Sequence, residues 1–145
     1  MAIDRPGLIQ PFNVGGWLPS TRIVPTGLWS APDAPQERWP AASLEQRRSE
    51  ARQRVAQWRA ASGQGPQISV YLSEGPGSQI LYEALVDDFA AIGVTTARAE
   101  TPGAADIVLR DRVARYASAR WFLNQFACEV RRGQCSEDAD YLVSL

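Results

Sequence analysis

Two adjacent carboxylates, Asp87 and Asp88, are the first candidates for acid–base chemistry in this sequence. On a helix, neighbouring side chains point about 100° apart, so this pair cannot flank one substrate as catalytic carboxylates do. We therefore expect both side chains to be solvated. Asp4 and Arg5 are also adjacent, and we interpret them as a buried ion pair that fixes a helix to its surroundings.

The stretch EGPGS at 74–78 lies between an expected strand and an expected helix. Glycines at such a place let backbone N–H groups approach an anion at the start of a helix. A dinucleotide-binding pattern would need a glycine where Ile80 stands, and no GK[ST] sequence follows. A tight turn between strand and helix is therefore the favoured interpretation.

The basic residues are unusual, because all fifteen are Arg and the chain contains neither Lys nor His. Without His there is no Ser-His-Asp triad and no imidazole metal ligand, and without Lys there is no Schiff base. We expect a protein that is not an enzyme and that uses no cofactor or metal. The formal net charge of −1 provides no excess of positive charge for nucleic acid.

Cys128 and Cys135 are the two cysteines of the chain. Their C-x6-C spacing is not that of a redox C-x-x-C motif, and two thiols without His make a poor zinc site. A disulfide across the corner between two expected helices is favoured, and it would indicate an oxidising compartment. Two free buried thiols remain the alternative.

The 145 residues, 45% of them hydrophobic, suffice for one domain with a core. Residues 1–42 hold seven of the ten prolines and three of the five tryptophans, without a sustained period. We predict an extended segment that wraps along a larger body. Residues 43–145 are predicted to form an α/β lobe that is incomplete at both ends. No apolar run reaches the ~20 residues of a membrane span, and the first residues lack the zones of a signal peptide.

Periodicity and turn residues place the elements of this lobe. Ser43 and Gln46 fit a capping box for a helix near 43–61, with Gly63 as its stop. Its apolar face would carry Leu44, Ala51, Val55 and Trp58. Its outer face would carry the ion pairs Glu45–Arg48 and Glu50–Arg54. Interleaved Glu favours a solvated face over a nucleic-acid helix.

The rest of the lobe is predicted to alternate strands and helices. Strands are expected at 68–72, 94–99 and 105–109 in a small mixed sheet, with a helix near 78–92 that ends at Gly93. Ser118 is expected to cap a further helix closed by Gly133, and Ser136 to start another.

Several stretches in order resemble the family 5 extracellular solute-binding proteins, the periplasmic or lipid-anchored receptors of oligopeptide, dipeptide and nickel ABC importers. They are AIDRPGLI, IVPTGLW, ISVYLSEGPGSQILYEALVDDFAAIGV, ADIVLRDRVARYASARWFLNQF and CSEDADYLV. The resemblance covers all 145 residues, and its most specific part is AIDR followed by P-x-G-L-W. It implies one lobe of a two-lobed, type II-like periplasmic binding protein, with AIDR near the end of a helix and this chain a fragment covering most of the second lobe.

The resemblance also implies a function. Such receptors close two lobes over a ligand and then dock on a membrane permease. We therefore expect the substrate-binding lobe of an ABC transporter for peptides or similar small solutes, periplasmic and monomeric, with an inner-membrane ABC permease as partner and no nucleic acid. The alternative is a periplasmic structural or interaction protein that presents its Trp-rich first 42 residues to a partner.

The family's ligand loop, laid on this sequence, gives the candidate ligand-binding residues Arg112, Arg115, Tyr116, Trp121 and Asn124. Arg115 stands where the family has an Asp that holds the α-amino group of a peptide, and a cation cannot accept an ammonium. Either the amine site is lost or the ligand is of another kind. Both arginines could instead face solvent, or pair with Asp111, Asp106 or Glu137.

Overall fold

The computed structural model describes residues 2–25, 27–28 and 42–128. The chain divides into two compact units. The first unit is Met1–Pro19 with Trp39–Asp111, and the second unit is Ser20–Arg38 with Arg112–Leu145.

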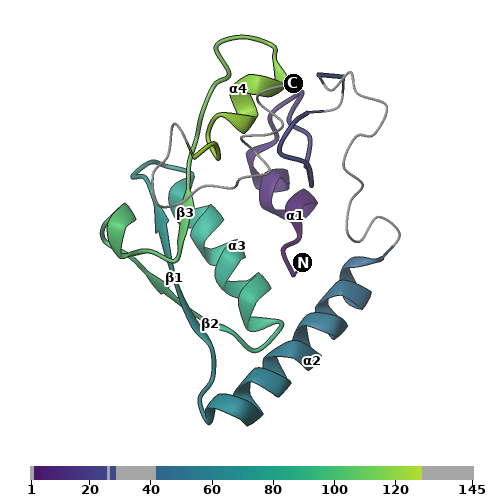
Figure 1. Ribbon diagram of the computed structural model, residues 1–145, viewed down its shortest axis with the longest axis vertical. Coiled ribbons are helices and arrows are strands. Elements are labelled where there is room, and N and C mark those ends of the chain that lie inside the picture. The colour runs from purple at the N-terminus through teal and green to yellow at the C-terminus, as the bar shows by residue number, and fades with distance from the viewer. Residues whose placement is uncertain (1, 26, 29–41, 129–145) are drawn as a thin grey trace. The chain divides into compact units, whose positions relative to one another are not determined.

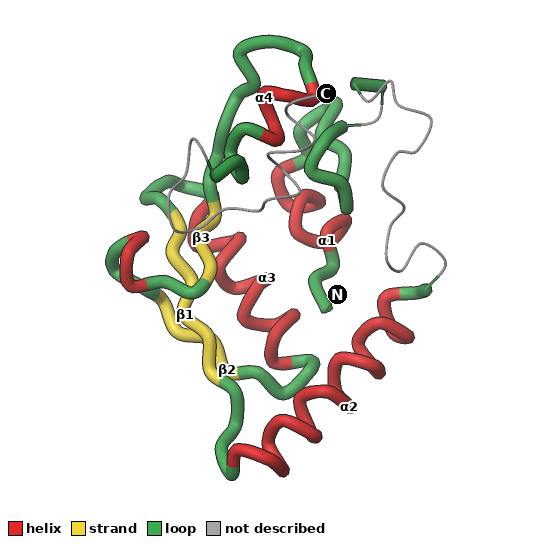
Figure 2. Tube along the Cα trace, in the orientation of Figure 1, coloured by secondary structure: helices red, strands yellow, loops and turns green. Residues whose placement is uncertain are grey.

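The first unit is an α/β structure with a three-stranded sheet in the order β2-β1-β3 (Figures 1 and 2). The described elements, in chain order, are α1 (Arg5–Ile9), η1 (Gln10–Phe12), α2 (Leu44–Ser62), β1 (Gln67–Leu72), α3 (Ser78–Ala90), β2 (Thr95–Arg98), η2 (Pro102–Ala104) and β3 (Ile107–Leu109). The three strands and the helix after β1 are confirmed. The sheet is parallel at both pairings, so the mixed sheet expected from the sequence is wrong. A helix between β1 and β2 returns the chain to the same end of the sheet, which makes the pair parallel.

One face of the sheet packs against α3. Ile68, Val70 and Leu72 alternate along β1 toward that face, and Val70 is fully buried. From α3 they meet Leu85 and Phe89, which belong to the apolar stripe predicted for this helix. The core of the first unit therefore lies between β1 and α3, because both elements carry their apolar period toward each other.

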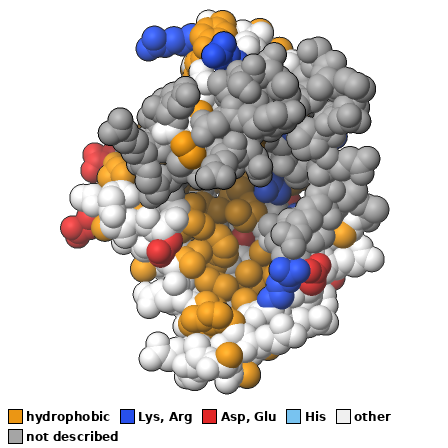
Figure 3. Space-filling model, viewed as in Figure 1, with side chains coloured by type: hydrophobic (Ala, Val, Ile, Leu, Met, Phe, Trp, Pro, Cys, Tyr) orange, Lys and Arg blue, Asp and Glu red, His pale blue; other side chains and the backbone are white. Residues whose placement is uncertain are grey.

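Helix α2 begins and ends as predicted, but little of it is buried. Ser43 accepts from the backbone N–H of Gln46 at 3.2 Å, and the Gln46 side chain accepts from the Ser43 N–H at 2.8 Å. Gly63 closes the helix at φ 73°, a conformation that glycine adopts without strain. Of the expected apolar face, Ala51 is buried and packs with Ile92, but Trp58 is exposed. Figure 3 shows hydrophobic side chains gathered between α2 and α3.

The AIDR stretch leads into a helix, and the helix expected to end near it would lie before residue 2, outside the described residues. Asp4 is the N-cap of α1 and accepts from the Gly7 N–H at 3.2 Å. Residues 1–42 are accordingly not extended throughout, since α1 and η1 form within them. Ile3 and Leu8 of this stretch pack against the cluster between β1 and α3.

The described part of the second unit contains α4 (Ala119–Leu123). Ser118 caps it as predicted, accepting from the Arg120 N–H at 3.2 Å. The helix ends at Leu123, short of the predicted stop at Gly133. Gly133 and the helix expected from Ser136 lie outside the described residues. Val24, Leu123 and Ala127 are buried in this unit.

Candidate functional site

The carboxyl edge of the sheet is the part of the first unit best suited to a ligand. Helix α3 carries the chain from β1 to β2 on one side of β1, whereas β3 pairs with β1 on its other side. The strand order therefore reverses between β1 and β3. In open parallel sheets, ligands bind outside the carboxyl ends of the strands at such a reversal. The chain segments that leave this edge start at Ser73 after β1 and at Arg110 after β3.

The segment after β1 is a tight turn. The Ser78 N–H donates to the Gly75 carbonyl at 3.1 Å, and the Ser78 hydroxyl donates to the Ser73 carbonyl. Neither Gly75 nor Gly77 has a positive φ. A Cβ added to Gly77 would lie 2.6 Å from Cε1 of Phe12, so a close ring explains this glycine without any anion. The interpretation of EGPGS as a tight turn is confirmed.

Asp106, just before β3, fixes that strand to β1. Its carboxylate accepts from the Ser69 N–H at 2.7 Å and from the Ser69 hydroxyl at 2.8 Å. These hydrogen bonds favour the charged form, with the backbone N–H as the larger cause, and they lower the pKa of Asp106. The Asp106 carboxylate thus accepts hydrogen bonds from Ser69 of β1. No ion pair joins it to Arg112 or Arg115 in the described part of the chain.

The five candidate ligand-binding residues all lie in the second unit. Arg112, Arg115 and Tyr116 are exposed in the segment before α4. Trp121 and Asn124 are half-buried, and their i, i+3 spacing puts them on the same side of α4. Trp121 packs edge-on against Phe122, with ring centroids 5.0 Å apart.

Arg112 and Arg115 were expected either to bind a ligand, to face solvent, or to pair with nearby carboxylates. Among the described residues, no ion pair joins Arg112 or Arg115 to Asp106 or Asp111. Glu137 lies outside the described residues. Solvent exposure is therefore what the structure shows for both guanidinium groups.

Cys128 is disulfide-bonded, so it is not the free thiol of the alternative interpretation. Cys135 lies outside the described residues, and its pairing with Cys128 stays a prediction.

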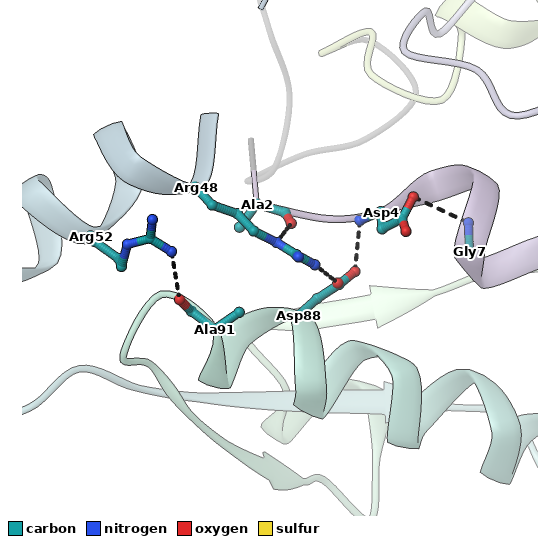
Figure 4. Close-up of polar contacts among 7 residues, drawn as sticks. All are labelled: Ala2, Asp4, Gly7, Arg48, Arg52, Asp88 and Ala91. Atoms are coloured by element: carbon teal, nitrogen blue, oxygen red, sulfur yellow. Dashed lines mark hydrogen bonds and ion pairs between the residues drawn. The ribbon is translucent and has the colours of Figure 1, made fainter. Parts of the chain in front are cut away.

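A polar junction that the sequence did not predict joins α1, α2 and α3 (Figure 4). Asp88 of α3 is 6% exposed, so its expected solvation is wrong. Its carboxylate accepts from the Arg48 guanidinium and, at 2.7 Å, from the Asp4 N–H. Arg48 also donates through Nε to the Ala2 carbonyl at 3.2 Å. The AIDR stretch is thus held by Asp88 and Arg48, and the expected buried pair between Asp4 and Arg5 is not among the ion pairs of the described residues.

This junction also redistributes the charges of α2. Glu50 and Arg54 pair at 2.6 Å as predicted. Arg48 is taken by Asp88, so the predicted pair with Glu45 is wrong and Glu45 pairs with Arg52 instead. The sequence contained an indication that Asp88 is buried and paired. Asp88 stands in the buried stripe of Leu81, Leu85 and Ile92 at helical spacing, where an acid needs a partner.

Searches against family models, curated proteins and solved structures find no match to this chain. Within residues 2–25, 27–28 and 42–128, no cluster of carboxylates or cysteines is suited to a metal ion. In the same part of the chain, no helix is long and apolar enough to cross a membrane.

Proposed function

We propose that this chain is a solute-binding lobe of the kind found in the receptors of ABC importers, and that it binds a peptide or similar small solute without transforming it. On this proposal the protein acts in the periplasm and delivers its ligand to a membrane permease. The resemblance in sequence motifs is the origin of the proposal, and the topology of the first unit supports it.

The reversal of strand order between β1 and β3 is the observation that carries this proposal. A parallel sheet with such a reversal offers a binding crevice at its carboxyl edge, whatever the ligand. The turn Ser73–Gly77 after β1 is closed by its own hydrogen bonds, and the Phe12 ring lies close to Gly77. The chain after β3 leads directly into the segment that holds the five candidate ligand residues.

The composition supports binding over catalysis. The chain has no His or Lys, and Asp88, the most buried carboxylate of the described residues, is occupied by Arg48 and a backbone N–H. Aromatic side chains and asparagine, as in Tyr116, Trp121 and Asn124, are typical of sites that hold a ligand by packing and hydrogen bonds.

The experiment is a titration of the chain with a panel of tripeptides, followed by changes in the backbone amide chemical shifts. We expect weak, saturable shifts at residues 110–124, because one lobe buries only part of a ligand. Shifts confined to α2, or no shifts with any member of the panel, would contradict the proposal. Deleting the gene and measuring peptide uptake by intact cells provides the matching test of the importer role.

The second candidate function is a structural or interaction protein that presents its N-terminal region to a partner. The exposed apolar side chains of Val14, Trp17 and Leu18 favour it, with Trp17 53% and Leu18 84% exposed. The tripeptide experiment separates the two candidates, since this one predicts no shifts near residues 110–124.

A further inference from the structure

The segment from Arg110 to Arg120 has a charge that the rest of the chain does not share. Its eleven residues, RDRVARYASAR, contain four Arg and one Asp, a net charge of 4 − 1 = +3, whereas the whole chain has −1. The segment follows the carboxyl end of β3. A local excess of positive charge attracts anions over distances up to about the Debye length, ~8–10 Å in ordinary buffers.

Among the described residues, the guanidinium groups of this segment have no acceptor. Arg112, Arg115 and Arg120 are exposed, and within the described part of the chain none of their guanidinium groups has a hydrogen bond or ion pair. By contrast, Arg48, Arg52, Arg54, Arg59 and Arg98 all donate to carboxylate, carbonyl or amide oxygens of this chain. The fold therefore uses these five guanidinium groups as donors, whereas those of Arg112, Arg115 and Arg120 are available to a ligand.

The side chains around these arginines suit a small ligand with an apolar part. Val113, which lies between the two arginines in the sequence, is 87% exposed, and Tyr116, which follows Arg115, is 53% exposed. A guanidinium group presents its donors in a planar fork that matches the oxygens of a carboxylate or a phosphate. An exposed apolar side chain and an aromatic ring beside it can contact the rest of such a molecule.

We propose that Arg112 and Arg115 select a small anionic solute, one that carries a carboxylate or a phosphate and lacks a free amino group near it. This inference rests on the proposed solute-binding function and specifies its ligand class. A free ammonium near the bound oxygens would be repelled by the same guanidinium groups, so a free amino end should weaken binding.

The test compares three probes on the uniformly ¹⁵N-labelled 145-residue chain at constant ionic strength: triglycine, N-acetyltriglycine and inorganic phosphate. The first two differ in the charge of the amino end, and the third separates phosphate from carboxylate recognition. We expect the acetylated peptide or phosphate to shift the amides of 112–116 saturably, with a dissociation constant on the order of 1–10 mM. Triglycine should bind at least fivefold more weakly.

Variants decide whether the two arginines are responsible. Arg112→Gln/Arg115→Gln should raise the dissociation constant of the anion at least fivefold. The control Arg22→Gln/Arg54→Gln removes the same charge from other exposed arginines and should change it less than twofold. The single variant Arg115→Lys keeps the charge without the fork, and we expect it to bind with intermediate affinity.

The outcomes separate this inference from the function on which it rests. Triglycine binding as tightly as its acetylated form, or equal losses in both double variants, would overturn the anion selection and leave solute binding in place. If no probe shifts residues 110–124, solute binding itself fails. Shifts spread evenly over the whole chain would mean general ion screening and would also overturn the inference.

Discussion

Helix α2 and the segment from 110 to 120 are both rich in arginine, and they use it differently. On α2, Arg48 bridges to the buried Asp88, Arg52 and Arg54 pair with glutamates, and Arg59 donates to the Gly93 carbonyl. In the other segment, the guanidinium groups of Arg112 and Arg115 have no acceptor among the described residues. The same side chain thus stabilises the fold in one region and stays available for a ligand in the other.

Removing the buried carboxylate of the α2 junction should have the largest effect. Asp88→Ala leaves the Asp4 N–H without its acceptor and the Arg48 guanidinium without its carboxylate partner. We expect a loss of about 2–4 kcal/mol in the free energy of unfolding, somewhat below the range for a fully buried pair because the Arg48 side chain is 22% exposed. Urea denaturation followed by circular dichroism measures it.

The neighbouring carboxylate is the matched control for this prediction. Asp87 is exposed and its carboxylate has no hydrogen bond or ion pair in the described part of the chain, so Asp87→Ala should change the free energy of unfolding by less than about 0.5 kcal/mol. Equal losses from the two variants would mean that the Asp88 junction does not hold α1 and α2 to α3.

Weakening the start of α2 should have an intermediate effect. Ser43→Ala removes the acceptor of the Gln46 N–H and half of the capping box. We expect a loss of about 1 kcal/mol, while Ser43→Asp should retain most of the stability because Asp is also a good N-cap. Thermal unfolding of the two variants checks this, and identical melting temperatures for Ala and Asp would show that the cap contributes nothing.

Replacing one arginine in each region should have a small effect on the free energy of unfolding, and the effect should be larger on α2. Arg54→Gln breaks an exposed i, i+4 pair and should lose about 0.3–0.5 kcal/mol. Arg112→Gln breaks no interaction among the described residues, so we expect a change that cannot be distinguished from zero. A loss above about 1 kcal/mol for Arg112→Gln would show that this arginine serves the fold, and the contrast would fail.

The smallest predicted effect is the pH dependence of the β1–β3 contact. Because hydrogen bonds from Ser69 lower the pKa of Asp106 in the folded state, the contact stabilises the fold above the ordinary carboxyl pKa of about 3.9. The stabilisation is lost as the pH falls through the lowered pKa. The difference in unfolding free energy between wild type and Asp106→Asn should therefore shrink between pH 6 and pH 3. A difference that grows toward acid would have the wrong sign.

Local patterns predicted the fold elements well. The Ser43 capping box, the Gly63 stop and the strand at 68–72 each depend on residues near one another in the chain, and all three are confirmed. The parallel direction of the sheet and the partner of Arg48 depend on contacts between distant residues. A helix-spaced Glu45 looked like the natural partner of Arg48, but Asp88, forty residues away, takes it.

The candidate site was predicted from resemblance, and its physical basis is only partly visible in the sequence. Exposure of Arg112, Arg115 and Tyr116 follows from a polar segment without periodicity. The reversal of strand order between β1 and β3 could not be predicted, because several strand orders fit the same strand and helix lengths. The burial of Asp88 was predictable from its place in an apolar stripe of α3. The expectation that Asp87 and Asp88 are both solvated treated the two as equivalent and was wrong for Asp88.

Intermolecular nuclear Overhauser effects between N-acetyltriglycine and the labelled chain test the central claim most directly, because they name the side chains that contact a solute. The account predicts contacts from the peptide's methylene and acetyl protons to the Tyr116 ring and to the side chains of Arg112 and Arg115. Contacts confined to the exposed Trp17 and Leu18, or to α2, would contradict the claim that the segment after β3 binds the solute.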